Sequence, residues 1–288
     1  MRKFAILLVL VCSAALKAED TVSLAYLKNP VGARPVGMGE TFTGLSNDIN
    51  CVFYNPAALS SMSKYSFSFS HIEFLQGIRY ELLSGLIPVG AGSSGAISVI
   101  YINNGLQEKR DAYGVVEGDF TPYQVVPIFS FAGNIAGGLS LGGNVKLPYE
   151  SIDTYNSIKV VFDFAGFYRA DKNYSFGVNL QNIGAYNDLP VNLKLGAAYQ
   201  DNFLQAGLDV NIPYRSNISL SSGAEIMVVN NCFIRGGLRH KMGEKFDLVS
   251  NITLGFGFIY DIFSLDYGFK MYDELGNTHF ISLIVKLK

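Results

Sequence analysis

The sequence predicts an all-β protein: a transmembrane antiparallel β-barrel of about 14 strands with an N-terminal hatch or plug. From about residue 63 to the last residue, ten-residue stretches of alternating apolar and polar side chains recur between turns. Because side chains alternate faces along a strand, each stretch has one apolar and one polar face. Charged residues are only 16% of the chain, against about 25% in an average soluble domain. In a membrane barrel, the apolar faces meet lipid and the polar faces line a lumen.

The first 18 residues have the features of a secretory signal peptide. Arg2 and Lys3 supply the charged start, residues 4–11 form an apolar core, and alanines up to Ala18 offer small residues for cleavage. The apolar run of about 13 residues is too short for an ordinary transmembrane helix, which needs about 20. We therefore expect a signal peptide over residues 1–18 and export of the mature chain.

The three cysteines fit no zinc site. Cys12 directly follows the apolar core and would suggest a lipoprotein, but Val11 occupies the position where a small residue is expected. The mature chain keeps Cys51 and Cys232, whose separation matches no metal-binding spacing. An exported protein could join these two in a disulfide; a pair of buried thiols is the alternative that we favour.

Residues 19–62 differ from the rest of the mature chain. They contain the run NPVGARPVGMGETFTGLSNDINCVFYNPAALSS, which is rich in Gly, Pro and Asn and has no sustained period of two. The segment has too little apolar content for a separate domain, so we expect compact irregular structure with a short helix. A lumen of this width leaks unless it is filled, and irregular backbone is tolerated at membrane depth inside a lumen. The sequence therefore predicts a hatch over 19–62 and a barrel over 63–288.

The barrel strands follow one another along the chain. In the first, Tyr65, Phe67 and Phe69 alternate with serines, and in the ninth Leu204 and Leu208 alternate with polar or small residues. The predicted strands span residues 64–72, 78–88, 94–103, 122–132, 136–148, 157–169, 173–182, 190–200, 203–212, 216–228, 231–240, 248–259, 262–272 and 279–288.

The connections between these strands alternate in length, which is an independent test of the fold. If the first strand leaves the periplasm, the connections on the outer side are mostly longer than those on the inner side. Outer-membrane barrels show this asymmetry of short periplasmic turns and long external loops. The longest outer connection, 104–121, is expected to be a solvated loop, with binding of a partner or covering of the entrance as the alternatives.

Charged side chains within the predicted strands fall on the polar faces. They include Lys159, Asp163, Lys194, Asp209, Glu225, Arg235, Arg239, Asp266 and Lys270. On the lipid face at mid-bilayer, a Lys or Arg would cost about 2–4 kcal/mol. In the lumen these charges either define a path for a solute or form paired networks that hold a plug; both alternatives stay open.

Other motifs are weak. Gly32, Gly37 and Gly39 do not make a phosphate-binding loop, because no strand precedes them and no Gly-Lys-Ser/Thr follows; we expect them to permit tight packing. The three histidines lie in distant segments, and no nucleophile motif accompanies them. We therefore expect no enzyme, no metal site and no cofactor. A net charge of -2 leaves no footprint for nucleic acid.

Three ordered motifs carry a family resemblance. GARPVGMGETFTGLSNDINCVFYNPAAL looks like the N-terminal signature of FadL-like outer-membrane proteins, especially the PorV/PorQ branch, and its triplet Asn55-Pro56-Ala57 matches the hatch motif of that superfamily. QNIGAYNDLPVNLKLGAAY, residues 181–199, resembles the same branch. FSLDYGFKMYDELGNTHFISLIVKL, residues 263–287, does so as well. The similarity covers the expected hatch and much of the C-terminal half.

The resemblance implies an integral outer-membrane barrel whose hatch gates the passage of hydrophobic small molecules such as long-chain fatty acids. The residues expected to bind ligand or gate are Gly37, Met38, Gly39, Asn55, Pro56 and Ala57. The structural alternative is that Asn55-Pro56-Ala57 forms a turn that fixes the hatch to the barrel wall. A kink near Gly92 and Gly95 is a plausible exit. Outer-membrane lipids are the expected surroundings.

The second functional hypothesis is a PorV-type, non-enzymatic component of type IX protein secretion or surface attachment. A secreted protein or secretion-system components would then be the partners. A continuous apolar tunnel would favour the transport role, whereas a sealed or polar lumen with exposed apolar loop residues would favour the secretion role. The chain departs from the larger fatty-acid transporters in being short, and it ends in Leu287-Lys288 where such barrels end in Phe.

Overall fold

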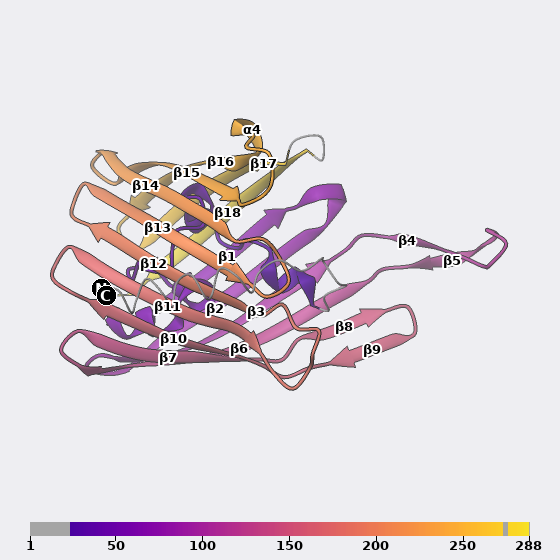
Figure 1. The fold of residues 1–288 in the computed structure, drawn as a ribbon, viewed down its shortest axis with the longest axis horizontal. Coiled ribbons are helices and arrows are strands. Elements are labelled where there is room, and N and C mark those ends of the chain that lie inside the picture. Colours follow the sequence, from indigo (N-terminus) through magenta and orange to yellow (C-terminus); the bar gives the residue numbers. More distant parts are fainter. Residues whose placement is uncertain (1–23, 273–275, 288) are drawn as a thin grey trace.

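Fourteen antiparallel strands form a closed barrel in the computed structural model, which describes residues 24–272 and 276–287 (Figure 1). Barrel strands that follow one another along the chain pair with each other, and β1 pairs with β18 to close the ring. Strands β3 and β6 pair directly, although residues 104–122 lie between them in the sequence. The predicted fourteen-stranded all-β barrel is thus confirmed. The barrel strands are β1 (Ser66–Glu73), β2 (Arg79–Gly90), β3 (Ser93–Asn103), β6 (Tyr123–Ala136), β7 (Leu139–Lys146), β10 (Val161–Arg169), β11 (Tyr174–Ile183), β12 (Asn192–Gln200), β13 (Leu204–Pro213), β14 (Ser219–Val229), β15 (Cys232–Lys241), β16 (Ile252–Tyr260), β17 (Phe263–Met271) and β18 (Asn277–Lys286).

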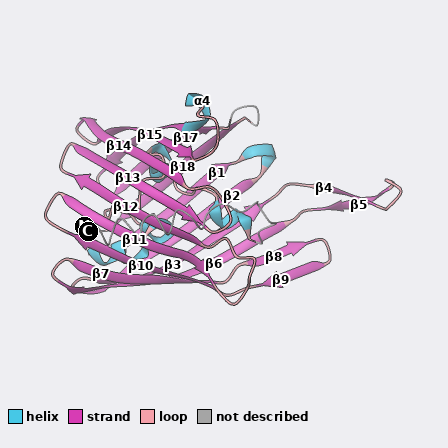
Figure 2. Cartoon of the chain, in the orientation of Figure 1, coloured by secondary structure: helices cyan, strands magenta, loops and turns pink. Residues whose placement is uncertain are grey.

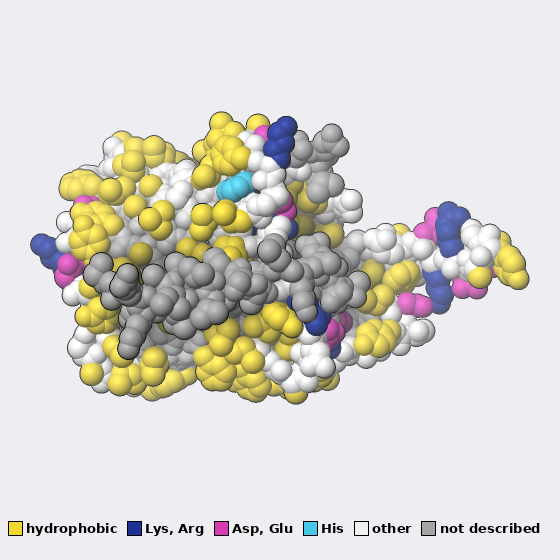
Figure 3. Space-filling model, in the orientation of Figure 1, with side chains coloured by type: hydrophobic (Ala, Val, Ile, Leu, Met, Phe, Trp, Pro, Cys, Tyr) yellow, Lys and Arg dark blue, Asp and Glu magenta, His cyan; other side chains and the backbone are white. Residues whose placement is uncertain are grey.

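The alternating pattern sorts side chains between the two faces of the wall. In β1, Ser66 and Ser68 point inward and are buried, whereas Phe67 and Phe69 point outward and are about half exposed. Large apolar side chains are exposed on the other barrel strands in the same register. Figure 3 shows apolar side chains spread over the wall and charged ones near its two ends. Such a large apolar outer surface suits contact with lipid.

Connections at the two ends of the barrel differ in length, as predicted. At one end the turns after β2, β6, β10, β12, β14 and β16 hold two to four residues; we call this the short-turn end. Asp171 and Asp201 organise two of these turns by accepting backbone N–H groups, which lowers the pKa of both carboxyls. Every connection at the opposite, long-loop end holds five or more residues.

Two hairpins at the long-loop end were not predicted. Strands β4 (Gln107–Arg110) and β5 (Val116–Phe120) pair only with each other and project from the barrel (Figure 1). Strands β8 (Tyr149–Ile152) and β9 (Tyr155–Ile158) extend the sheet from β6. The predicted loop 104–121 is therefore partly a hairpin, and the predicted strand 157–169 begins too early. Similarly, the first residues of the predicted strand 248–259 form helix α4 (Leu248–Asn251), capped by the Asp247 carboxylate.

The N-terminal segment, residues 24–65, packs against the inward face of the wall. It contains four short helices: η1 (Ala25–Lys28), α2 (Ala33–Gly37), α3 (Cys51–Tyr54) and η2 (Pro56–Ser61). Contacts of α2 with β15–β18 and of η2 with β3, β6, β7 and β10 place these helices within the ring of strands (Figure 2). Between residues 31 and 60, all but Asn47 and Phe53 are buried. No helix in the described residues is long and apolar enough to cross a bilayer.

Glycines on the inward face of the wall allow this close packing. The atoms nearest to Gly177, Gly196, Gly207, Gly223 and Gly237 include those of residues 38–44 in the N-terminal segment. A methyl group built at Gly223 or Gly237 would overlap the backbone of Met38 or Gly39. The glycine-rich polar register of these strands therefore leaves space for main chain of the segment.

Candidate ligand-binding site

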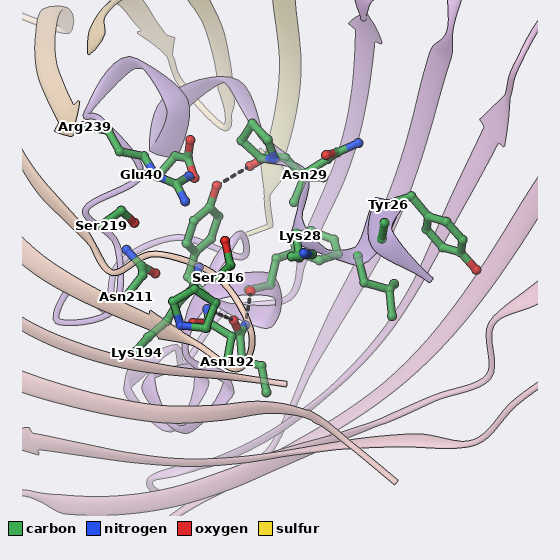
Figure 4. Close-up of a pocket in the computed structure, with 18 of the residues that line it drawn as sticks. Tyr26, Lys28, Asn29, Glu40, Asn192, Lys194, Asn211, Ser216, Ser219 and Arg239 are labelled. Atoms are coloured by element: carbon green, nitrogen blue, oxygen red, sulfur yellow. Dashed lines mark hydrogen bonds and ion pairs between the residues drawn. The ribbon is translucent and has the colours of Figure 1, made fainter. Parts of the chain in front are cut away.

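A cavity of about 600 Å³ lies between the N-terminal segment and the long-loop end of the barrel (Figure 4). Its lining comes from η1 and the following residues, from α3, and from the inward faces of strands around the ring. Two sides of the cavity differ in character, because different strands contribute apolar and charged side chains to it.

The apolar side comes from η1, β2, β3 and β6. The lining residues on this side are Tyr26, Leu27, Tyr80, Ile100, Ile102 and Ile128. The three isoleucines and Tyr80 are buried on the inward face. Their strands are apolar on both faces in this half of the barrel, since outward residues such as Leu83 and Ile97 are also large and apolar. This side can therefore bury the apolar body of a ligand without exposing polar groups.

The basic side comes from β12, β15 and β17. Lys270 Nζ donates to Glu40 Oε1 at 2.9 Å, and Arg239 forms an ion pair with the same carboxylate. Lys194 Nζ lies 4.7 Å from the ring centroid of Tyr54, a cation–π contact. Figure 4 shows Lys194 and Arg239 across the cavity from Tyr26.

Cations outnumber acids on this basic side. Lys146 at another part of the lining has its own acid, Asp163, at 2.8 Å, and Lys241 has Glu244 at 2.8 Å. Arg239 and Lys270 share the single carboxylate of Glu40. Desolvated cations attract anions strongly. The arrangement therefore suits a ligand that carries an acidic group at one end and an apolar body at the other.

A second ionic network lies on the opposite side of the N-terminal segment, toward the short-turn end. Arg34 in α2 donates to both carboxylate oxygens of Glu225, at 2.8 and 2.9 Å, and pairs with Asp48 at 3.2 Å. Arg235 pairs with Glu225 at 2.5 Å and with Asp266 at 2.7 Å. Of the two alternatives for the lumen charges, these contacts match the paired network that holds the segment to the wall.

The six residues that the sequence singled out lie at the contact between the N-terminal segment and the wall. They are Gly37, Met38, Gly39, Asn55, Pro56 and Ala57, and none of them lines the cavity. Gly39 N donates to Thr253 Oγ1 at 3.0 Å. Asn55 Nδ2 donates to the carbonyl oxygens of Thr43 and Gly166, at 2.8 and 3.1 Å, and its Oδ1 accepts from Ala57 N. The triplet thus makes the anchoring contacts expected of a turn fixed to the wall; a gating role stays a prediction.

Sequence reasoning missed the residues of the segment that line the cavity. Glu40, Tyr54 and Tyr26 carry no local pattern that marks them. The apolar side was signalled by strands 78–88, 94–103 and 122–132, which lack strict alternation of apolar and polar residues. The inward residues of these strands line the cavity and the outward ones lie on the lipid-facing surface, so both faces are apolar. The basic side was partly identified, because Lys194, Arg239 and Lys270 were expected to face the lumen.

The wall is irregular beside Gly92 and Gly95. The β2–β3 pairing shifts register between Pro88 and Gly90, next to the pair Ile87–Gly95, whereas β3 pairs with β6 from Ser93 to Asn103 without a shift. An exit there stays a prediction. A separate shallow hollow of about 600 Å³ lies on β11–β15, where the side chains are small. Its floor includes Ala206 and Ala224.

The cysteines and histidines form no site in the described chain. Cys51 and Cys232 are both free thiols, and only Cys51 is buried, so the expectation of two buried thiols holds for one of them. His71 pairs with Glu81 at 2.7 Å, and His279 contacts the Tyr267 hydroxyl at 2.8 Å. Within residues 24–272 and 276–287, no group of three potential ligands could hold a metal ion. Cys12 and the expected signal peptide lie outside the described residues.

The closed ring of strands, the internal N-terminal segment and the cavity with one apolar and one basic side define a β-barrel that encloses a partly filled lumen. Comparison with known proteins gives the family of the chain and solved structures with the same fold. The model of UPF0164, described as an uncharacterised protein family, matches residues 12–161, and the chain belongs to this family. No curated protein sequence matches the chain.

Solved structures with the same fold include two toluene transporters. TbuX of Ralstonia pickettii has 13% identity and a TM-score of 0.65, covering 89% of this chain and 98% of that one. TodX of Pseudomonas putida has 12% identity and a TM-score of 0.63, covering 94% and 98%. A Pseudomonas aeruginosa FadL homologue has 11% identity and a TM-score of 0.61, covering 90% and 98%. The expected FadL-like fold is confirmed; the PorV/PorQ branch stays a prediction.

Proposed function

We propose that this protein is an outer-membrane channel for amphipathic small molecules with an acidic head and an apolar body, such as long-chain fatty acids. The observation that carries the proposal is the cavity with one apolar and one basic side. The apolar outer wall supports a position in the outer membrane, with the long-loop end outside the cell. The similar barrels are described as toluene transporters, which supports a channel role; the surplus of cations here favours an acidic ligand.

We further propose that the N-terminal segment is a hatch. It lies between the cavity and the Arg34 network near the short-turn end, and its contacts with the wall are extensive. A molecule entering from the long-loop end would therefore meet the segment before it could reach the short-turn end. Passage requires the segment to move, or the molecule to leave sideways through the wall. No catalytic step is part of this proposal.

Apolar burial should supply most of the affinity. Each buried methylene contributes about 0.8 kcal/mol, which corresponds to an up to about fourfold gain in affinity per added carbon. We expect the affinity for saturated acids to rise with chain length until the apolar side is filled. Isothermal titration of a chain-length series into the detergent-solubilised barrel measures this gain, and an affinity independent of chain length would contradict it.

A tryptophan reporter tests whether the cavity binds such ligands. The chain contains no Trp, and Phe53 lines the cavity. In Phe53→Trp, a brominated fatty acid should quench the fluorescence with a saturable dependence on concentration. Phe203→Trp, at an exposed position in a short turn, is the matched control and should show only weak, unsaturable quenching. Equal quenching in both variants would overturn the proposed function.

The projecting hairpins favour the PorV-type secretion role as a second candidate. Tyr113 at the end of the β4–β5 hairpin is 92% exposed, and Val115 beside it is 61% exposed. Exposed apolar residues at such a position suit contact with a protein partner. Deleting residues 107–120 should abolish retention of an exported protein if this role holds, while leaving Phe53→Trp quenching unchanged. Unchanged retention of the exported protein by the deletion variant would contradict this role of the hairpin.

A further inference from the structure

A carboxylate of the N-terminal segment already occupies the basic side of the cavity. Glu40 follows α2, and its side chain is only 5% exposed. It accepts from Lys270 Nζ at 2.9 Å and pairs with Arg239, so that one acid serves two cations from β17 and β15. All three residues line the cavity. The acidic head of a bound molecule would therefore meet an anion that holds the same cations.

The surplus of cations determines what a second anion would encounter. Lys194 has its cation–π contact with Tyr54, and no hydrogen bond or ion pair is found for it within the described part of the chain. Two anions would therefore share three cations if an acidic molecule entered while Glu40 stayed near. Entry of the anion is favoured because Lys194, Arg239 and Lys270 outnumber the single carboxylate, Glu40, that lines this side of the cavity.

The backbone at Glu40 shows that this residue is held in place by its contacts. Its φ is 65°, in the left-handed region that a residue with a Cβ rarely adopts. Gly39 before it has the same φ, and its backbone approaches Leu238 in the wall. Conformations of this kind persist where surrounding contacts determine them. The N–H of Glu40 donates to the carbonyl oxygen of Pro35 at 2.8 Å, and its carboxylate makes two ion pairs. Loss of the ion pairs would remove one of these two sets of contacts.

We propose that the acidic head of a ligand competes with Glu40 for Arg239 and Lys270, and that displacement of Glu40 releases the N-terminal segment from the wall. The inference rests on the proposed function and adds the residue that couples binding to movement. A neutral molecule of the same length would fill the apolar side and leave Glu40 in place. Release of the segment would therefore be selective for acidic ligands.

Decanoate and decanol, which differ only in the head group, test the exchange by isothermal titration. In Glu40→Gln the competing charge is gone, so the affinity for decanoate should rise about tenfold, as expected for a lost charge-assisted pair. The affinity for decanol should stay within about twofold, because apolar burial is unchanged. Glu81→Gln is the matched control: it removes an acid that contacts His71 and does not line the cavity, and it should change neither affinity.

Amide hydrogen exchange over residues 38–43 supplies a second readout that does not depend on a stable variant. In the native chain, decanoate should increase exchange in this stretch and decanol should not. An unchanged decanoate-to-decanol affinity ratio in Glu40→Gln, or equal exchange with both ligands, would overturn the inference while leaving the proposed function in place. If neither compound binds the native chain, the proposed function fails and the inference with it.

Discussion

Glycine residues on the inward face of the wall set how closely the N-terminal segment can approach. At Gly237, a built methyl group overlaps Gly39 and Met38, whereas at the adjacent Gly236, on the outward face, it meets nothing within 4 Å. A Gly→Ala substitution would therefore meet packed backbone at Gly237 and open space at Gly236. The sequence predicted the alternation of faces here, but it could not identify which inward glycines meet the segment.

Gly237→Ala should destabilise the folded barrel, because the wall or the segment must shift to admit the methyl group. Overpacking of this kind costs about 1–3 kcal/mol. Gly236→Ala should change the free energy of unfolding by less than about 0.5 kcal/mol, as surface substitutions usually do. Urea unfolding, followed by the electrophoretic shift between folded and unfolded barrel, measures both. Equal effects of the two substitutions would contradict the packing described.

Asp209 is a second residue whose partners only the structure reveals. Its Oδ2 accepts from Phe42 N, Thr43 N and Thr43 Oγ1, at 3.2, 3.0 and 2.6 Å. The alternation of apolar and polar residues predicted that Asp209 faces the lumen. Its partners lie in the N-terminal segment, whose sequence does not alternate and so did not reveal them. Three hydrogen-bond donors of the N-terminal segment therefore share the carboxylate of Asp209 in the barrel wall.

Asp209→Ala should loosen the segment near residue 42. Buried donors left without an acceptor cost about 1–3 kcal/mol each, so the Phe42 and Thr43 amides should exchange hydrogen faster. Asp201→Ala is the control, since its carboxylate accepts the amides of Phe203 and Leu204 at an exposed turn. Unchanged protection at Phe42 and Thr43 in Asp209→Ala would show that the carboxylate does not hold the segment.

At the scale of elements, the fourteen barrel strands were predictable because lipid-facing and lumen-facing residues differ so strongly. The hairpin β4–β5 was not, because both of its faces are exposed and no apolar face forms. The start of β10 was misplaced for a different reason. Ile158 in β9 and Val160 after it continue the period of two into β10, so the sequence shows one strand where the chain makes two.

Deleting residues 107–120 should leave the barrel intact. Strands β4 and β5 pair only with each other, and the tie to the neighbouring hairpin is the exposed Lys109–Asp153 ion pair at 2.7 Å. Exposed pairs of this kind contribute about 0–1 kcal/mol. The urea midpoint of the deletion variant should therefore match that of the native chain. A loss of folding would show that the hairpin supports the barrel.

At the scale of the whole molecule, the cavity depends on how the N-terminal segment and several strands lie relative to one another, which the sequence of a single strand does not show. Its apolar side joins η1 to β2, β3 and β6, and its basic side joins Glu40 to β15 and β17. Closure of the ring and the path of the N-terminal segment create this arrangement. The sequence indicated a filled lumen, but irregular backbone without a period could not be traced. Under the proposed function, the N-terminal segment therefore both completes the cavity and closes the path between the cavity and the short-turn end.

A disulfide between segment and wall tests this claim. A Cβ built at Gly207 lies 3.1 Å from Thr41 Cβ, and disulfides join Cβ atoms about 3.5–4.5 Å apart, so a small shift admits the bond. Thr41→Cys with Gly207→Cys is made in a chain whose Cys51 and Cys232 are replaced by Ser. The reduced form of the same protein is its own control.

The measurement is uptake of radiolabelled oleate by diderm cells that lack an outer-membrane fatty-acid channel and express this chain. If the segment must move for passage, the oxidised variant should take up oleate at the rate of cells without the barrel. Reduction should restore the rate of the cysteine-free parent. Equal uptake by the oxidised and reduced forms, with the disulfide verified, would contradict passage past a moving N-terminal segment.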